Sequence, residues 1–311
     1  MRILIVGAGA TGGYFGGRLL EAGRAVTFLV RPGRAEELER DGLVVRSPIG
    51  NFQYPSPPLL LDHQLDQPFD LIVLCCKAYD LEAAMESFAP AVGAHTSILP
   101  LLNGLAHLDR LTERFGSGAV LGGQCVISLD RHSTGAILHL NEANQLSFGE
   151  LSGGLTPRIL RVAEALADAG FEANLSQHIL QDMWDKWCFI ATCAGITSTM
   201  RATIGDVLEA GGEWLISDLM AECVLIATAA GYPPAEQVRQ RYLKVLTEPG
   251  SRLTASMLRD IERGVGTEVE QILGDLSARR SALGIVPAVP SVLDVAGVHL
   301  RAYEARRRRE Q

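Results

Sequence analysis

Short apolar runs alternate with amphipathic segments along the first half of the chain. Runs rich in β-branched residues predict strands at residues 2–6, 25–30, 70–76 and 96–102. Segments with helical periodicity lie between them, at residues 14–22, 35–40, 81–91 and 105–115. Apolar strands that alternate with helices are typical of a parallel sheet buried on both faces. This half of the chain therefore predicts an α/β fold.

A weaker pattern of short strands follows. Residues 120–129, 135–140 and 145–148 alternate with turn residues, and we expect them to form antiparallel additions at the edge of the sheet. A helix is predicted over residues 156–169, with Pro157 near its start, and a last strand over residues 171–175.

The pattern changes at Ser176, after which no strand is predicted. Helical periodicity marks residues 180–199, 212–230, 234–246, 256–283 and 291–307. Because 311 residues are more than one core usually serves, we expect two domains. They are an α/β domain over residues 1–175 and an all-α domain over residues 176–311.

A glycine turn joins the first strand to the first helix. Gly7 allows a sharp turn, Gly9 allows the backbone to approach a pyrophosphate, and Gly12 allows the helix to pack closely on the strand. The helix N-terminus attracts phosphate through its unpaired N–H groups. We therefore expect a Rossmann-type, doubly wound dinucleotide-binding domain; the alternative is an ordinary glycine-rich turn. The candidate cofactor-binding residues of this turn are Gly7, Ala8, Gly9, Ala10, Thr11 and Gly12.

Three polar residues follow predicted strands, where ligands of open α/β sheets bind. Arg31 follows the second strand, and a guanidinium there suits the 2′-phosphate of NADP(H) better than a neutral ribose diol. Lys77 and Asn103 follow the next two strands, so we expect them near the cofactor or the substrate. The alternatives are exposed loop side chains for Arg31 and Lys77 and an Asn-Gly turn for Asn103.

Charge and cysteine usage exclude several other classes of function. The net charge of −8 gives no reason to expect nucleic acid or an anionic membrane as partner, and we interpret the basic run at 306–309 as a solvated helix end. The six cysteines lack metal-ligand spacing and indicate buried thiols in a reducing compartment. No apolar run approaches membrane-spanning length. We expect a cytoplasmic protein without metal, and the apolar helical half makes a homodimer plausible.

Lys186 is the candidate proton donor. It lies among Trp184, Trp187 and Cys188 in the most apolar predicted helix, where a lysine is costly unless it faces a cleft or a counter-ion. In a cleft its ammonium could donate a proton to an alkoxide as it forms on a carbonyl oxygen. The alternative is a lysine whose head group reaches water.

Ser256 and Glu268 form a second polar feature. They are twelve residues apart, so on one continuous helix each would lie within about 60° of one shared face. From spacing alone, a solvated charged face is the alternative to a substrate-binding role.

These positions together resemble the ketopantoate reductases (2-dehydropantoate 2-reductases). The resemblance spans residues 1–303 and rests on motifs that occur in a specific order. They are GAGATGGYFGGRL at 7–19, Arg31, CKAYD at 76–80, LNG at 102–104, MWDKW at 183–187 and SMLRDIERGVGTEVE at 256–270.

The resemblance implies a role for each matching residue. Lys186 would be the catalytic lysine, and Glu268 would assist substrate binding and catalysis. Ser256 would bind substrate, and Asn103 would line the site of both cofactor and substrate. Arg31 would bind the 2′-phosphate of NADP(H).

The chain also departs from the family pattern. Members matched to ketopantoate carry asparagines where this chain has Ile190, Ala194 and Leu253. We expect NADPH-dependent reduction of a 2-oxo acid, with ketopantoate reduced to pantoate for pantothenate biosynthesis as the named reaction. A different 2-oxo acid or ketone, and a non-catalytic NADP(H)-binding regulator, remain the alternatives.

Overall fold

The computed structural model describes residues 1–287 and 290–310, and its contacts divide the chain into two units. The first unit comprises Met1–Leu102 and His107–Ile179, and the second comprises Asn103–Ala106 and Leu180–Gln311. The sequence placed the boundary after residue 175 and assigned Asn103 to the first domain. The structure places Asn103 in the second unit.

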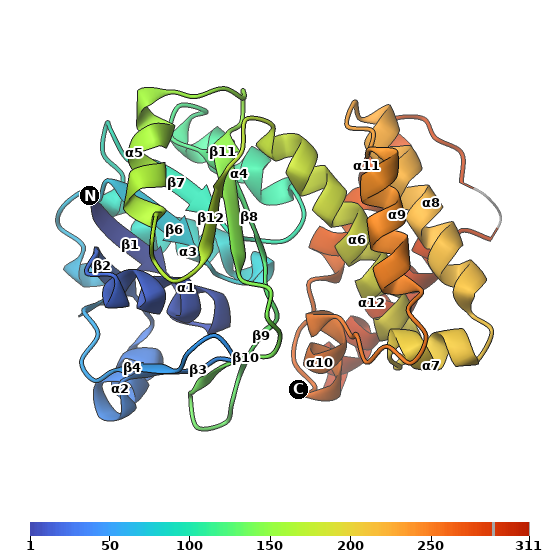
Figure 1. Ribbon diagram of the computed structural model, residues 1–311, viewed down its shortest axis with the longest axis horizontal. Coiled ribbons are helices and arrows are strands. Elements are labelled where there is room, and N and C mark those ends of the chain that lie inside the picture. Colours follow the sequence, from blue (N-terminus) through green and yellow to red (C-terminus); the bar gives the residue numbers. More distant parts are fainter. Residues whose placement is uncertain (288–289, 311) are drawn as a thin grey trace. The chain divides into compact units, whose positions relative to one another are not determined.

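A five-stranded parallel sheet forms the centre of the first unit (Figure 1). Its order is β5 (Leu59–Leu60), β2 (Ala25–Leu29), β1 (Arg2–Val6), β6 (Leu71–Leu74) and β7 (Ser97–Pro100). The chain moves from β1 to β2 on one side and returns to β6 on the other. The crevice outside the carboxyl ends of β1 and β6 is therefore the topological switch point at which such sheets bind ligands.

The predicted parallel strands are confirmed, and their burial explains their composition. Every residue of β6 and β7 is buried, as are Ile3–Val6 of β1, because helices cover both faces of such a sheet. The covering helices begin with α1 (Ala10–Glu21), α2 (Pro32–Asp41), α3 (Leu81–Phe88) and α4 (Ala106–Phe115).

The later strands form two further sheets instead of extending the parallel sheet at its edge, and each further sheet contains antiparallel pairing of the expected kind. One sheet has the order β4 (Phe52–Tyr54), β3 (Leu43–Arg46), β10 (Ile137–His139) and β9 (Leu129–Arg131). The other contains β12 (Glu172–Leu175), β11 (Gln145–Glu150) and β8 (Leu121–Val126), with α5 (Pro157–Leu166) before β12. The pairs β3–β10 and β11–β12 are parallel. Parallel pairing needs long crossovers, which a local pattern does not reveal.

Helix α1 packs against two sheets through glycines on neighbouring faces. A Cβ at Gly16 would lie 2.6 Å from the ring of Phe28 in β2, and a Cβ at Gly13 would lie 2.3 Å from Ile137 in β10. Side chains at these positions would push the helix off one sheet or the other. This close approach explains why glycines continue along the helix beyond the three that the sequence analysis interpreted.

The second unit contains only helices and one π-helical segment among its described residues. Its long first helix, α6 (Ile179–Met200), is followed by α7 (Ile204–Glu209), α8 (Glu213–Ala229) and α9 (Glu236–Leu246). Then come α10 (Ser256–Glu262), the π-helical segment Glu270–Gly274, α11 (Asp275–Ala282) and α12 (Val292–Glu310). Within residues 1–287 and 290–310, no helix is both long and apolar enough to cross a bilayer.

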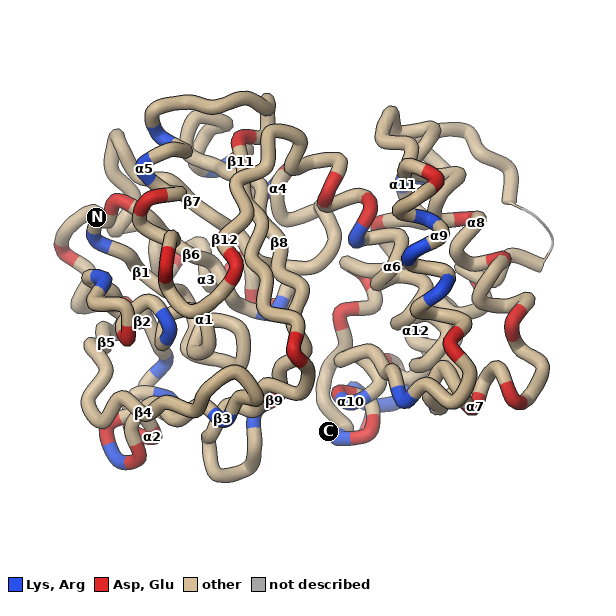
Figure 2. The backbone as a smooth tube through the Cα atoms, viewed as in Figure 1, with Lys and Arg blue, Asp and Glu red and all other residues tan. Residues whose placement is uncertain are grey.

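Among the described residues, charges of both signs are interspersed (Figure 2), and the cysteine thiols of the helical unit are buried. Acidic and basic positions are interspersed in both units (Figure 2). Cys188, Cys193 and Cys223 are buried. Burial raises the pKa of Cys193 and of Cys223 to about 12, so both thiols stay protonated and unreactive at neutral pH.

Candidate active site

The glycine turn presents an open face at the N-terminus of α1. Gly7 has a φ of +93° and its N–H donates to the carbonyl of Leu29, so the turn is held against β2. Gly9 is the N-cap of α1 and no side chain caps the helix. A Cβ at Gly9 would meet no atom within 4 Å, whereas a Cβ at Gly12 would lie 1.9 Å from the carbonyl oxygen of Gly7.

These two glycines therefore serve different purposes. Gly12 is required for packing, because helix α1 touches the glycine turn there and leaves no room for a side chain. Gly9 borders open space beside backbone N–H groups that no side chain caps. No acidic residue occupies the first turn of α1, so an anion can approach its positive end. This cradle fits the pyrophosphate of a dinucleotide.

Arg31 is the N-cap residue of α2, and its side chain is 72% exposed. Its Nη2 donates to Oδ1 of Asp80 across 2.8 Å, and this hydrogen bond raises the pKa of Arg31. Asp80 ends the short 3₁₀ helix Ala78–Asp80, for which Lys77 is the N-cap. The guanidinium is thus held at the carboxyl edge of the sheet with most of its surface open. No local pattern in the sequence links Asp80 to Arg31, because the two residues follow different strands.

Arg34 is a second residue that the sequence analysis did not single out. Its Nε donates to the carbonyl oxygen of Ala8 across 2.9 Å, and its Nη1 donates to Glu37 across 2.7 Å. Helix α2 is thereby tied directly to the glycine turn. The spacing of Arg31 and Arg34 within RPGR is the only sequence signal for this contact.

Lys186 and Asn103 meet in the second unit. The Nζ of Lys186 donates a hydrogen bond to Oδ1 of Asn103 across 3.2 Å, in partly buried surroundings. Lys186 lies on α6, and Asn103 lies in the short segment 103–106 that joins the second unit. An amide oxygen beside an ammonium fixes its direction without neutralising its charge.

The π-helical segment supports both of these residues. The indole Nε1 of Trp187, next to Lys186, donates to the carbonyl oxygen of Ile272 across 2.9 Å. Gly104, next to Asn103, has a φ of +75°, and a Cβ there would lie 2.5 Å from the carbonyl oxygen of Gln271. A π-helical turn frees backbone groups that an α-helix would pair, and such turns are frequent at functional sites.

Glu268 is 6% exposed and lies two residues before this segment. The single helix expected over residues 256–283 is wrong. Helix α10 ends at Glu262, Gly264 has a φ of +70°, and residues 265–268 are not helical. Glycine in the left-handed conformation commonly ends a helix, and the sequence RGVG contained that signal. Ser256 and Glu268 therefore do not share a helix face, and Ser256 is an exposed first residue of α10.

An apolar wall continues from Lys186 along α6. Ile190 is one helical turn further on and half-buried, and Ala194 is 2% exposed. The Oγ1 of Thr197 accepts the N–H of Ala255 across 3.3 Å, which joins α6 to the residue before Ser256. Leu253, three residues before α10 begins at Ser256, is half-buried.

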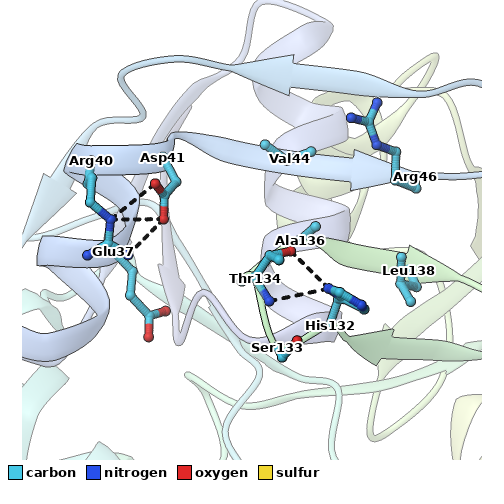
Figure 3. Close-up of a pocket in the computed structure, with 11 residues that line it drawn as sticks. Glu37, Arg40, Asp41, Val44, Arg46, His132, Ser133, Thr134, Ala136 and Leu138 are labelled. Atoms are coloured by element: carbon cyan, nitrogen blue, oxygen red, sulfur yellow. Dashed lines mark hydrogen bonds and ion pairs between the residues drawn. The ribbon is translucent and has the colours of Figure 1, made fainter.

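The first unit also has an open pocket, which lies beside the Arg34–Glu37 pair (Figure 3). It is bordered by α2, β3 and the turn between β9 and β10, including Arg46 and His132. Of its charged groups, Arg40 pairs with Asp41, and Glu37 pairs with Arg34 and Arg131 from outside the lining. None of the predicted site residues lines it, and we assign it no ligand.

Comparisons with known proteins identify the family. Residues 3–153 match the family model "Ketopantoate reductase PanE/ApbA", and residues 178–294 match the model of its C-terminal part. A protein of Bacillus subtilis (strain 168), described as the uncharacterized oxidoreductase YkpB, is 36% identical over 98% of this chain and 99% of its own.

Solved structures of other proteins share the fold of this chain. The crystal structure of 2-dehydropantoate 2-reductase from Geobacter metallireducens GS-15 has a TM-score of 0.87 at 27% identity and covers 97% of this chain and 99% of its own. A ternary structure of D-mandelate dehydrogenase with NADH and anilino(oxo)acetate shares the fold, with a TM-score of 0.87 at 22% identity over 99% of both chains. The predicted fold class and family resemblance are thereby confirmed. The chain is an oxidoreductase that belongs to the ketopantoate reductase family.

Proposed function

We propose that the protein reduces a 2-oxo acid to the 2-hydroxy acid with NADPH, and that ketopantoate, reduced to pantoate for pantothenate biosynthesis, is the first substrate to test. The observation that carries this proposal is the Lys186–Asn103 hydrogen bond, because it holds an ammonium in a fixed direction in partly buried surroundings. Family membership and the D-mandelate dehydrogenase bound to NADH support a nicotinamide cofactor.

The first unit would hold the cofactor, which supplies a hydride when bound. The first turn of α1 and the open face at Gly9 would bind its pyrophosphate, and Arg31 would bind the 2′-phosphate. The salt bridge to Asp80 keeps the Arg31 guanidinium at the edge of the sheet before the phosphate arrives.

The second unit would supply the proton. Lys186 would donate it from Nζ to the carbonyl oxygen as that oxygen gains negative charge, while Asn103 holds the ammonium in place. Glu268, buried beside the π-helical segment, and Ser256 would bind the substrate. Partial burial excludes water from the ammonium and strengthens its interaction with the developing oxyanion.

The apolar wall favours a second candidate within the same reaction class. Ile190, Ala194 and Leu253 offer no donor or acceptor side chain for a substrate hydroxyl. A site that does not hydrogen-bond a hydroxyl has no means to prefer ketopantoate over a 2-oxo acid with a plain branched or aromatic side chain. We therefore propose such acids as the alternative substrates.

A panel of 2-oxo acids tests the proposal. The protein is incubated with NADPH or NADH and with ketopantoate, a branched 2-oxo acid or phenylglyoxylate, and loss of the reduced cofactor is followed by absorbance. We expect turnover with at least one acid and a preference for NADPH. Cofactor binding without turnover of any acid would instead favour a non-catalytic regulator. Sedimentation in the same buffer tests the proposed homodimer, and fractionation of the native cells tests the proposed cytoplasmic location.

A further inference from the structure

The C-terminal half of α12 contacts residues 265–270, the connection after α10 that contains Glu268. The hydroxyl of Tyr303 donates to the carbonyl oxygen of Val265 across 2.9 Å. Glu304 accepts hydrogen bonds from Thr267, and Arg301 pairs with Glu270. Three residues within one turn of α12 thus reach the connection on both sides of Glu268. Figure 1 shows the end of α12, near the C-terminus, beside α10.

The contact at Thr267 is the most complete of the three. Oε1 of Glu304 accepts the backbone N–H of Thr267 across 2.6 Å and its Oγ1–H across 2.8 Å. Oε2 of Glu304 accepts from Nε and Nη2 of Arg307 across 3.2 and 3.0 Å. The Glu304 side chain is only 13% exposed. One oxygen of this nearly buried carboxylate therefore holds the residue before Glu268, and Arg307 holds the other oxygen in place.

Arg307 belongs to the basic run that the sequence analysis interpreted as a solvated helix end. Its side chain is 23% exposed and ion-paired, so that interpretation is wrong for this residue. Burial by itself raises the pKa of Glu304, but the hydrogen bonds from Thr267 and Arg307 outweigh it and lower the pKa below the ordinary value. Glu304 therefore stays ionised at neutral pH.

The segment after Glu268 is held by a more exposed ion pair. The guanidinium of Arg301 binds both oxygens of Glu270, across 2.8 and 3.0 Å. Gly274 leaves the room for this pair. A Cβ there would overlap Oε2 of Glu270 and would lie 3.0 Å from Nη2 of Arg301. The carbonyl oxygen of Glu268 itself accepts the N–H of Ile272, whose own carbonyl is bonded to Trp187.

We propose that Glu304, with Arg307, is a positioning residue for Glu268: it fixes the backbone at Thr267 so that the Glu268 carboxylate keeps the orientation the reaction needs. This inference rests on the role of Glu268 in the proposed function. Residues 265–268 are not helical, so the conformation at Thr267 depends on hydrogen bonds from outside this loop. The α12 carboxylate supplies two of them.

Kinetics of single and double variants test the inference. Glu304→Ala removes the oxygen that accepts both hydrogen bonds from Thr267. We expect kcat/KM for the 2-oxo acid to fall on the order of 10–100-fold, because small displacements of a site residue are costly. NADPH affinity, measured by fluorescence, should not change. Glu304→Gln keeps a carbonyl oxygen that can accept from Thr267 and should restore most of the activity. Glu310→Ala, an exposed substitution in the same helix, is the matched control.

A double-mutant cycle separates positioning from general damage. If Glu304 acts through Glu268, adding Glu304→Ala to Glu268→Gln should cause no further loss. Losses that add in full would overturn the inference, as would full activity in Glu304→Ala. Should Glu304→Ala fail to fold, Thr267→Val removes one of the two donors and should give a smaller loss of the same kind; full activity in Thr267→Val would then overturn it. If Glu268→Gln itself keeps full activity, the assigned role of Glu268 fails, and this inference fails with it.

Discussion

The ammonium of Lys186 donates a hydrogen bond to the side-chain oxygen of Asn103 across 3.2 Å, although 83 positions separate the two residues in the chain. One residue lies in the middle of a long helix and the other follows a strand of the parallel sheet. The asparagine oxygen orients the ammonium and leaves its positive charge intact. A proton donor needs both properties, because its proton must be aimed and must be available.

Lys186→Ala should therefore abolish most turnover while leaving cofactor binding intact. We expect kcat to fall by a factor on the order of 10²–10⁴, the usual contribution of a general acid. Single-turnover rates and NADPH binding by fluorescence measure the two effects separately. Lys244→Ala, at an exposed lysine of α9, is the control and should behave as the unmodified protein. Retained turnover in Lys186→Ala would remove this residue from the mechanism.

Gly9→Ala and Gly12→Ala should have opposite consequences. A Cβ at Gly9 meets nothing, so the variant should fold normally and lose NADPH affinity, because the methyl group occupies the space of the pyrophosphate. A Cβ at Gly12 overlaps the Gly7 carbonyl, so this variant should lose about 1–3 kcal/mol of unfolding free energy or more. Denaturant titration and cofactor titration on both variants test the distinction. Equal stability losses would contradict it.

Arg31→Ala should weaken NADPH binding by roughly 10–100-fold, since hydrogen bonds to charged groups contribute about 1.5–3 kcal/mol. NADH lacks the 2′-phosphate, so its affinity should not change. Asp80→Ala removes the carboxylate that holds Arg31 at the edge of the sheet and should weaken NADPH binding by less than Arg31→Ala does. Calorimetric titration with both cofactors provides the measurement. The assignment of Arg31 to the 2′-phosphate is wrong if both cofactors weaken equally.

Ile190→Asn should shift substrate preference toward hydroxylated 2-oxo acids. Ile190 lies one turn after Lys186 on α6 and is half-buried, so an amide there could bond a substrate hydroxyl. We expect the ratio of kcat/KM for ketopantoate to that for a branched 2-oxo acid to rise about tenfold or more. Ile190→Leu keeps the wall apolar and should leave this ratio unchanged. An unchanged ratio in Ile190→Asn would place the residue outside the substrate site.

Glu150 should make stability depend on acid pH. Its side chain, at the end of β11, is 5% exposed and pairs with Arg158 and Thr156. Burial raises the pKa of Glu150, but these hydrogen bonds lower it below the ordinary value. Because the folded-state pKa is the lower one, the stabilisation is complete above the unfolded pKa of about 4.3 and is lost as pH falls through the folded value.

Glu150→Gln should therefore cost about 1–3 kcal/mol of unfolding free energy at neutral pH and much less in acid. Urea titrations across the acid range compare the variant with the unmodified protein. Glu164→Gln, at an exposed glutamate of α5, should show no such pH-dependent difference. A constant difference for Glu150→Gln at all pH values would show that the ion pair is not its source.

Much of the fold could be predicted from local pattern. The buried strands β1, β2, β6 and β7 and the helices α1, α6 and α12 all appear where apolar periodicity indicated them, because burial on one or both faces leaves its period in the sequence. Residues 256–283 show the limit. Two glycines interrupt them at Gly264 and Gly266, and only the packing of α12 on residues 265–270 determines the path that the chain takes there.

The sequence by itself determined the glycine turn, the parallel sheet, the helical second half and the residue types available for chemistry, since these follow from short-range periodicity and steric constraints. The tertiary structure alone decided which of those residues meet. It joined Asn103 to Lys186, Asp80 to Arg31 and Glu304 to Thr267. Such pairs are 37 to 83 positions apart, and the free energy that selects them comes from packing and polar satisfaction across whole elements, which no local pattern records.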